Sequence, residues 1–185
     1  MNTEELNALK NRAQKIAVEH GFYMDVKPDA YYLGLIMSVM GRAISADQKG
    51  YHADMELFEE LLTNENPFSN AFFLSIKDSV EDEIADIVIR LLDFAGIKEY
   101  ELRIEVHPIS DCKMALWTLG ESGLSGTLFY LMNILTDSFY FGDIRSCISN
   151  LIDILFNCFG KMTGSDKDLW WFVKQKMRYN GCDRC

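Results

Sequence analysis

Apolar residues recur three or four positions apart along most of the chain, with charged residues between them. The segment 4–19 shows the pattern in its simplest form, with apolar positions at Leu6, Leu9, Ala13 and Ile16. This spacing places the apolar side chains on one face of a helix. The same periodicity predicts further helices at 29–48, 55–62, from Phe72 or Lys77 to Ala95, 112–138, 143–160 and 166–180.

Capping and turn residues refine these helices. Asp29 is expected to cap the start of the second helix. Residues 100–106 alternate with period two, as a strand does, but a lone strand in a helical protein has no partner. We therefore predict an extended connector there. The start of the 112–138 helix is left open by three glycines, Gly120, Gly123 and Gly126.

These elements predict an all-α fold, an antiparallel helical bundle that forms a single domain over residues 1–185. The first half, about 1–97, and the second half, about 110–180, have similar layouts of two long helices. The bundle could therefore be a tandem arrangement of two helix pairs. The two halves share no direct residue repeat, so an internal duplication is only suggested by the layout.

Composition and charge narrow the classes of partner. Apolar residues make up 49% of the chain, and the formal net charge is -10. This negative charge disfavours nucleic acid and an anionic membrane surface, whereas a small anion such as a nucleotide needs only a local cation. We expect neither a membrane span nor a signal peptide. The cysteine count of five is odd, which favours free thiols and a cytoplasmic location.

Two predicted helices carry a line of polar residues within an apolar surround. In the helix at 29–48, the polar positions between Leu33 and Ala46 are Ser38, Arg42 and Ser45. In the helix ending at Ala95, the polar positions from residue 84 onward are Asp86, Arg90 and Asp93, and Glu83 and Ser79 extend this line backwards. Such spacing places each set on one face of its helix.

The second of these helices must be largely buried, because its flanks are apolar on both sides. A buried carboxylate without a cation is costly, so Glu83 and Asp86 require a positive neighbour. Two cations would meet the requirement. One is a divalent metal such as Mg²⁺ or Mn²⁺ held by oxygen ligands, and the other is Arg42 from the facing helix.

Three motifs resemble those of the MazG-type all-α nucleoside triphosphate pyrophosphohydrolases. The run from Ser79 to Asp93 is similar to the second metal-binding helix of this superfamily, whose Glu-x-x-Asp pattern is matched by Glu83 and Asp86. The run from Leu35 to Gly50 looks like the first metal helix. The third motif resembles the C-terminal Lys-x-x-Tyr-Asn signature, at Lys176, Tyr179 and Asn180.

The resemblance implies a helical fold, Mg²⁺ as cofactor, and hydrolysis of a nucleoside triphosphate to the monophosphate and pyrophosphate. Glu83 and Asp86 would be metal ligands, and Asp82 or Glu81 would be second-layer or solvent-facing residues. Lys176, Tyr179 and Asn180 would reach the phosphates or the base. Metal ions in such a site activate water and neutralise phosphate charge.

The chain departs from the superfamily where the first metal helix should supply its acids. The expected Glu-x-x-Glu positions hold Val39 and Arg42, and Ser45 stands at a further acidic position. Valine cannot ligate a metal and arginine repels one, so we expect standard catalysis to be impaired or lost, and we favour Arg42 as a cation in place of the metal. Downstream, Asp183 stands where the superfamily has an arginine.

Three functions therefore stay open: a pyrophosphohydrolase with a reduced metal site, a non-catalytic nucleotide- or anion-binding relative, and a helical protein-interaction module.

Three minor features have both a functional and a structural interpretation, and a fourth suggests an oligomer. The Cys182–Cys185 pair could bind zinc or act as a redox couple, but a frayed tail is the simpler interpretation. The run from Trp170 to Phe172 could stack a base or pack in the core. A line of polar residues could be a second degenerate site or could make helix–helix contacts; its members are Ser146, Asn150, Asp153 and Asn157. The aromatic-rich segment 129–141 is a candidate surface for a homo-oligomer.

Overall fold

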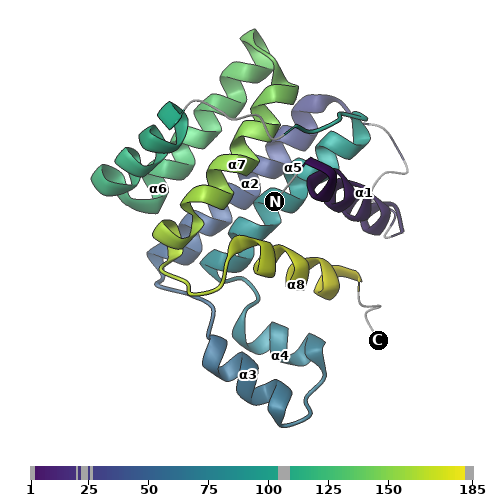
Figure 1. Cartoon of the computed structure of the whole chain (residues 1–185), viewed down its shortest axis with the longest axis vertical. Coiled ribbons are helices and arrows are strands. Elements are labelled where there is room, and N and C mark those ends of the chain that lie inside the picture. The colour runs from purple at the N-terminus through teal and green to yellow at the C-terminus, as the bar shows by residue number, and fades with distance from the viewer. Residues whose placement is uncertain (1–2, 20, 22–24, 26, 104–108, 182–185) are drawn as a thin grey trace.

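The computed structural model describes residues 3–19, 21, 25, 27–103 and 109–181. All regular structure within these residues is helical, which confirms the predicted all-α class (Figure 1). The helices are α1 (Thr3–Glu19), α2 (Asp29–Gln48), α3 (Met55–Thr63), α4 (Phe68–Ser75), α5 (Val80–Ile97), α6 (Ile109–Phe141), α7 (Ile144–Thr163) and α8 (Leu169–Gly181).

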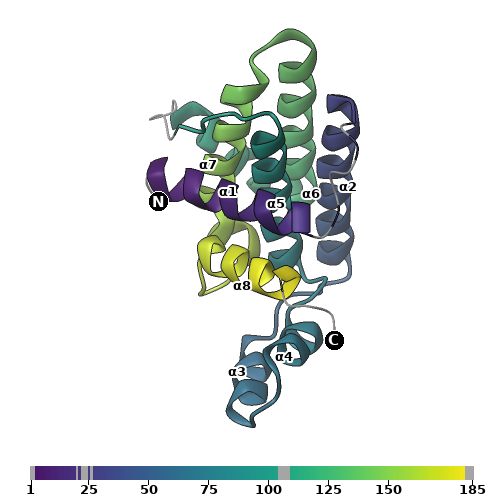
Figure 2. The same ribbon diagram turned by 90° about the vertical axis from the view of Figure 1, so that its right-hand side faces the viewer.

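Four long helices form the bundle. α2 packs on α5, α6 packs on α7, and the two pairs join through α2 with α6 and α5 with α7. α2 and α5 run antiparallel, because Asp29 at the start of α2 lies 3.1 Å from Lys98 just after the end of α5. The long helices stand side by side in two perpendicular views (Figures 1 and 2).

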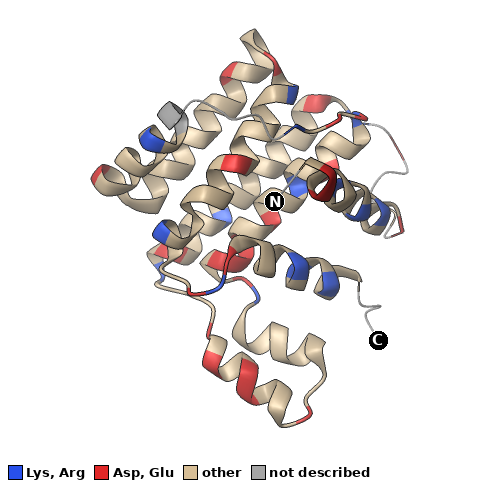
Figure 3. Ribbon diagram, in the orientation of Figure 1, with Lys and Arg blue, Asp and Glu red and all other residues tan. Residues whose placement is uncertain are grey.

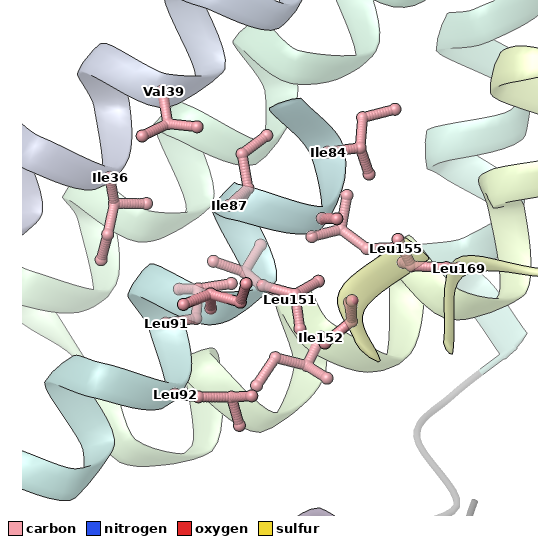
Figure 4. Packing of buried hydrophobic residues seen from close by; sticks show 14 of the residues in the cluster. Ile36, Val39, Ile84, Ile87, Leu91, Leu92, Leu151, Ile152, Leu155 and Leu169 are labelled. Carbon is pink, nitrogen blue, oxygen red and sulfur yellow. The ribbon is translucent and has the colours of Figure 1, made fainter. Parts of the chain in front are cut away.

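Helix α5 is the centre of the molecule. α1 and α8 cross it in addition to its bundle neighbours α2 and α7, so that every residue from Val80 to Ile89 is buried. Ile36 and Val39 of α2 face its apolar side chains, while side chains of α7 and α8 cover it from another direction (Figure 4). The burial predicted from its two apolar flanks is therefore confirmed.

Helices α3 and α4 form a hairpin at one end of the bundle. They pack on each other, and α4 also contacts α8. The hairpin extends beyond the four long helices in both views (Figures 1 and 2). Acidic positions mark α3, whereas α4 carries no charged residue (Figure 3).

The predicted bounds of α2 are confirmed but its predicted cap is wrong, and the predicted start of the next long helix is wrong as well. The N-cap of α2 is Pro28, not Asp29, and the carboxylate of Asp29 bonds to Lys98 instead of a backbone N–H. The single helix predicted from Phe72 or Lys77 to Ala95 is two helices, because Asp78 takes a left-handed conformation with φ 64° between α4 and α5. Ser79 then caps α5 by accepting a hydrogen bond from the backbone N–H of Asp82 at 3.2 Å.

Helix α6 is also broken, although one helix was predicted at 112–138. Gly123 has φ 64° and ψ -164°, a conformation that side chains other than hydrogen strongly disfavour. The hydroxyl of Thr127 bonds to the carbonyl oxygen of Ala115 at 3.4 Å. These residues would lie about 18 Å apart along a straight helix, so the segments 109–122 and 124–141 fold back on each other.

The connector predicted at 100–106 is described only as far as residue 103, and this part contains neither helix nor strand. Leu102 is fully buried, and Asn7 of α1 binds its backbone on both sides. The amide nitrogen of Asn7 donates to the Leu102 carbonyl at 2.8 Å, and the Leu102 N–H donates to the Asn7 side-chain oxygen at 3.1 Å. The connector is thus fixed to α1 at this point.

Candidate functional site at the start of α5

Four carboxylates lie in the first two turns of α5, and all of them are buried. The relative exposures of Glu81, Asp82, Glu83 and Asp86 are 2%, 1%, 3% and 5%. The solvent-facing position expected for Glu81 or Asp82 is therefore wrong, because α8 and the chain after α2 cover this turn. The start of a helix favours negative charge, but this effect alone is too small to offset such burial.

Arg42 supplies the cation for two of these carboxylates. Its Nε donates to both oxygens of Glu83 at 2.9 Å, and its Nη2 donates to Asp86 Oδ2 at 2.7 Å. Burial alone would lower the pKa of Arg42, but the hydrogen bonds and charges of Glu83 and Asp86 raise it overall. The guanidinium therefore remains charged, and charge-assisted bonds of this kind are strong.

The polar line of α2 lies at the edge of the bundle rather than inside it. Ser38 and Arg42 are exposed, and Ser45 is partly exposed. Val39 points the other way, into the core, with 2% exposure. On α5, Arg90 approaches the second oxygen of Asp86, with Nε 3.9 Å from Oδ1. Asp86 thus has a guanidinium on either side.

Lys176 of α8 supplies the cation for Asp82. Its Nζ donates to Asp82 Oδ2 at 2.7 Å, and the backbone N–H of Asp78 donates to the same oxygen at 2.9 Å. Asp82 Oδ1 is buried and has no hydrogen-bond partner. Burial raises the pKa of Asp82 to about 6, against the opposing effect of Lys176. Burial would lower the pKa of Lys176, but Asp82 raises it overall.

Glu81 fixes the chain that follows α2. One of its oxygens lies 2.9 Å from His52 Nδ1, and the other accepts the backbone N–H of Ala53 at 2.8 Å. The N–H of Val80 donates to the carbonyl of Tyr51 at 3.0 Å in the same region. The sequence analysis did not assign a role to His52, and no local pattern pairs it with a residue on α5.

Tyr179, a second C-terminal residue singled out by the sequence, lies against α4. The ring of Tyr179 stacks on Phe72, with 4.6 Å between centroids and 22° between planes, and Lys176 Nζ lies 5.9 Å from the centre of the Phe72 ring. Asn180 is partly buried near the end of α8. The structure therefore brings Lys176 and Tyr179 together, but around Phe72, which the sequence analysis did not single out.

The residues present do not fit the Mg²⁺ site that the superfamily resemblance implies. Only Glu83 and Asp86 remain of the expected acids, and both are bonded to Arg42, whereas Val39 packs in the core. Residues 3–19, 21, 25, 27–103 and 109–181 contain no group of three or more His, Cys, Asp or Glu side chains arranged to hold a metal. Asp183 lies outside the described residues.

Two of the minor features of the sequence make local contacts. Ser146 Oγ donates to Asp143 at 2.6 Å, and the side-chain amide of Asn157 donates to the backbone of Asp153 at 2.8 Å. These bonds lie within α7 or its cap and do not assemble a second site. Trp171 packs edge-on against Phe58, with 5.7 Å between centroids. The Cys182–Cys185 pair lies outside the described residues.

The resemblance to the MazG-type superfamily rests on the sequence motifs alone. No family model, curated protein or solved structure matches this chain. Among the described helices, none combines the length and the apolar character needed to cross a bilayer.

Proposed function

We propose that the protein is a non-hydrolytic relative of the MazG-type pyrophosphohydrolases that acts as a helical interaction module. The observation that supports this most directly is the position of Arg42, which bonds to Glu83 and Asp86 at 2.7 to 2.9 Å. A cation fixed to the chain satisfies both carboxylates without a metal. Without a metal, the carboxylates at the start of α5 lack the group that would activate water and neutralise the phosphates.

The state of the C-terminal residues favours an interaction module over nucleotide binding. Lys176 is bonded to Asp82 and its side chain is only 12% exposed, while the Tyr179 ring is stacked on Phe72. A triphosphate would have to displace Asp82 from Lys176. It would also approach the carboxylates of Glu83 and Asp86, which repel it.

A second candidate is metal-dependent hydrolysis with Arg42 moved aside. The Arg42 side chain is 49% exposed, whereas those of Glu83 and Asp86 are 4% and 7% exposed. The guanidinium could therefore swing into water and leave two oxygen donors for a divalent ion. The entropy and solvation of a free arginine favour such a movement, and the loss of its hydrogen bonds opposes it.

Titration calorimetry with Mn²⁺ and Mg²⁺ separates the two candidates. We expect no binding to the wild type and no pyrophosphate release from a panel of nucleoside triphosphates. Micromolar binding that Glu83→Gln abolishes would favour the hydrolase. Thermal shifts with nucleotides, with and without Mg²⁺, test nucleotide binding, because a ligand of the folded state raises Tm. A saturable shift would reject a purely protein-interacting role.

A gain-of-function variant tests whether Arg42 occupies the place of a metal. Arg42→Glu adds a third carboxylate beside Glu83 and Asp86, and carboxylates are the ligands that Mn²⁺ prefers. We expect this variant to gain Mn²⁺ binding and a Tm that rises with Mn²⁺. The matched Arg42→Gln variant removes the same cation without adding a ligand, and should gain neither. Equal responses of the two variants would contradict the proposal.

A further inference from the structure

Two cysteines from different helices meet where α6 packs on α7. Cys112 lies in the first turn of α6 and is partly buried, while Cys158 lies near the end of α7 and is 0% exposed. Neither cysteine forms a disulfide, and their side chains share a hydrogen bond. The remaining described cysteine, Cys147, lies elsewhere on α7, where its thiol contacts the carbonyl of Ile134 at 3.8 Å.

The surroundings make the two thiols unequal. Cys112 is close to the start of α6, where the helix dipole stabilises a thiolate, and it is the more accessible of the two. Burial, together with the nearby Cys112 thiol, raises the pKa of Cys158 to about 11. Asp153 has the same effect, and Lys161 opposes it. Its greater accessibility and its place near a helix start therefore favour Cys112 as the first thiol to react, with Cys158 beside it.

Cys112 also lies before the break in α6. The segment 109–122, which carries Cys112, joins the rest of α6 through Gly123. The hydrogen bond from Thr127 to Ala115 holds the fold-back from one side. A covalent bond from Cys112 to Cys158 would fix the start of this segment, the end away from Gly123, to α7. Trp117, which is 62% exposed on the same segment, would be fixed with it.

We propose that Cys112 and Cys158 are a redox pair that closes to an intramolecular disulfide by exchange with a low-molecular-weight disulfide. The Cys112 thiolate attacks one sulfur of the small disulfide and displaces one small thiolate. The Cys158 thiolate then attacks the Cys112 sulfur of the mixed disulfide and displaces the second. Two protein thiols are oxidised and one small disulfide is reduced to two thiols, which take up the protons.

Oxidised glutathione provides the test. The starting protein carries Cys182→Ser and Cys185→Ser, so that three of the five cysteines remain. After incubation, trapping with an alkylating agent under denaturing conditions should show the loss of two thiols. Peptide mass spectrometry should find Cys112 linked to Cys158 and Cys147 free. Three unreacted thiols, or a bond to Cys147, would overturn the proposal.

Single variants test the order of the steps. Cys158→Ser should stop the reaction at a stable glutathione adduct on Cys112, whereas Cys112→Ser should leave Cys158 unmodified. Cys147→Ser is the matched control and should form the disulfide like its parent. A lasting adduct on Cys112 while Cys158 is present would show that the two sulfurs cannot meet. None of these readouts depends on the proposed function at the start of α5.

Discussion

At the scale of single residues, the ion pairs at the start of α5 are asymmetric. The carboxylates of Glu83 and Asp86 are buried, while the Arg42 side chain is half exposed. The cost of desolvation therefore falls mainly on the acids, and the arginine reaches in from the solvent side. Removal of the arginine leaves two dry carboxylates, which is worse than removal of the whole group.

Arg42→Met should therefore lower the free energy of unfolding by about 2–4 kcal/mol at pH 7. Urea denaturation measures this change. The matched control is the triple variant Arg42→Met, Glu83→Gln, Asp86→Asn, in which no buried charge is left without a partner. It should recover a large part of the loss. A triple variant less stable than Arg42→Met alone would contradict an electrostatic origin.

Asp82 should make stability depend on pH. Its folded pKa of about 6 is above its ordinary value of 3.8, so the folded state binds the proton more tightly than the unfolded state. Its contribution to stability is fully present below pH 4 and is lost as the pH rises through 6, by on the order of 3 kcal/mol. Asp82→Asn cannot titrate and should lack this loss.

Denaturation of the wild type and of Asp82→Asn at several pH values between 4 and 8 measures the effect. The free energy of unfolding of Asp82→Asn should increase relative to that of the wild type through this window and then level off. A constant difference would show that Asp82 titrates at its ordinary pKa. Asp143 is shifted in the opposite direction to Asp82, because a hydrogen bond to Ser146 is the main cause that lowers its pKa.

At the scale of helices, the break in α6 depends on one glycine. Gly123 has φ 64°, and a Cβ there would meet no atom within 4 Å, so only the backbone opposes a side chain. Gly123→Ala should cost about 1–3 kcal/mol. Gly120 lies in the helical segment before the break and has equal space. Gly120→Ala should stabilise the protein by about 0.5–1 kcal/mol, because alanine favours a helix.

Thermal and urea unfolding of the two alanine variants checks this opposition of sign. If both variants were stabilised, the first part of α6 would continue into the second as one helix. Circular dichroism of Gly123→Ala adds an independent readout, because an α6 straightened into one helix would keep the helical signal of the wild type.

Helix α8 is held to α5 by a buried pair. Lys176→Met leaves Asp82 without its cation and should cost about 3 kcal/mol at pH 7. Lys174 lies two positions earlier on the same helix, is exposed, and has its Nζ 4.6 Å from the Trp170 ring centre. Lys174→Met should change stability by no more than about 0.5 kcal/mol. Similar losses in urea denaturation would mean that helix propensity, not the pair with Asp82, causes the effect.

The sequence predicted best where polar residues interrupt an apolar helix. The line on α5 demanded a cation, and Arg42 on the next long helix upstream was an available partner. The pair of Asp82 with Lys176 was not predictable, because these residues are 94 positions apart and no periodicity links them. The break before α5 was missed because Asp78, rather than glycine, takes the left-handed conformation. The break in α6 was not predicted, because three glycines spaced three residues apart are compatible with either a helix or a break.

At the scale of the whole molecule, α2 packs on α5 in the first half of the chain, and α6 packs on α7 in the second half. The halves are not equivalent, however. α5 is covered on all sides and carries the buried carboxylates, whereas exposed aromatic residues, Phe129, Tyr140 and Phe141, occur on α6. Burial of charge therefore belongs to the first pair.

The net charge of -10 should make stability depend on salt in a way that separates surface from interior. Raising sodium chloride from about 0.02 to 0.2 M shortens the Debye length to below 10 Å and screens the repulsion between exposed acids. We expect the Tm of the wild type to rise. The pair of Lys176 and Asp82 is dry, so the Tm difference between the wild type and Lys176→Met should stay nearly constant. Scanning calorimetry at the two salt concentrations measures both. A difference that shrinks with salt would show that water and ions reach this pair, and that α8 opens away from α5 in solution.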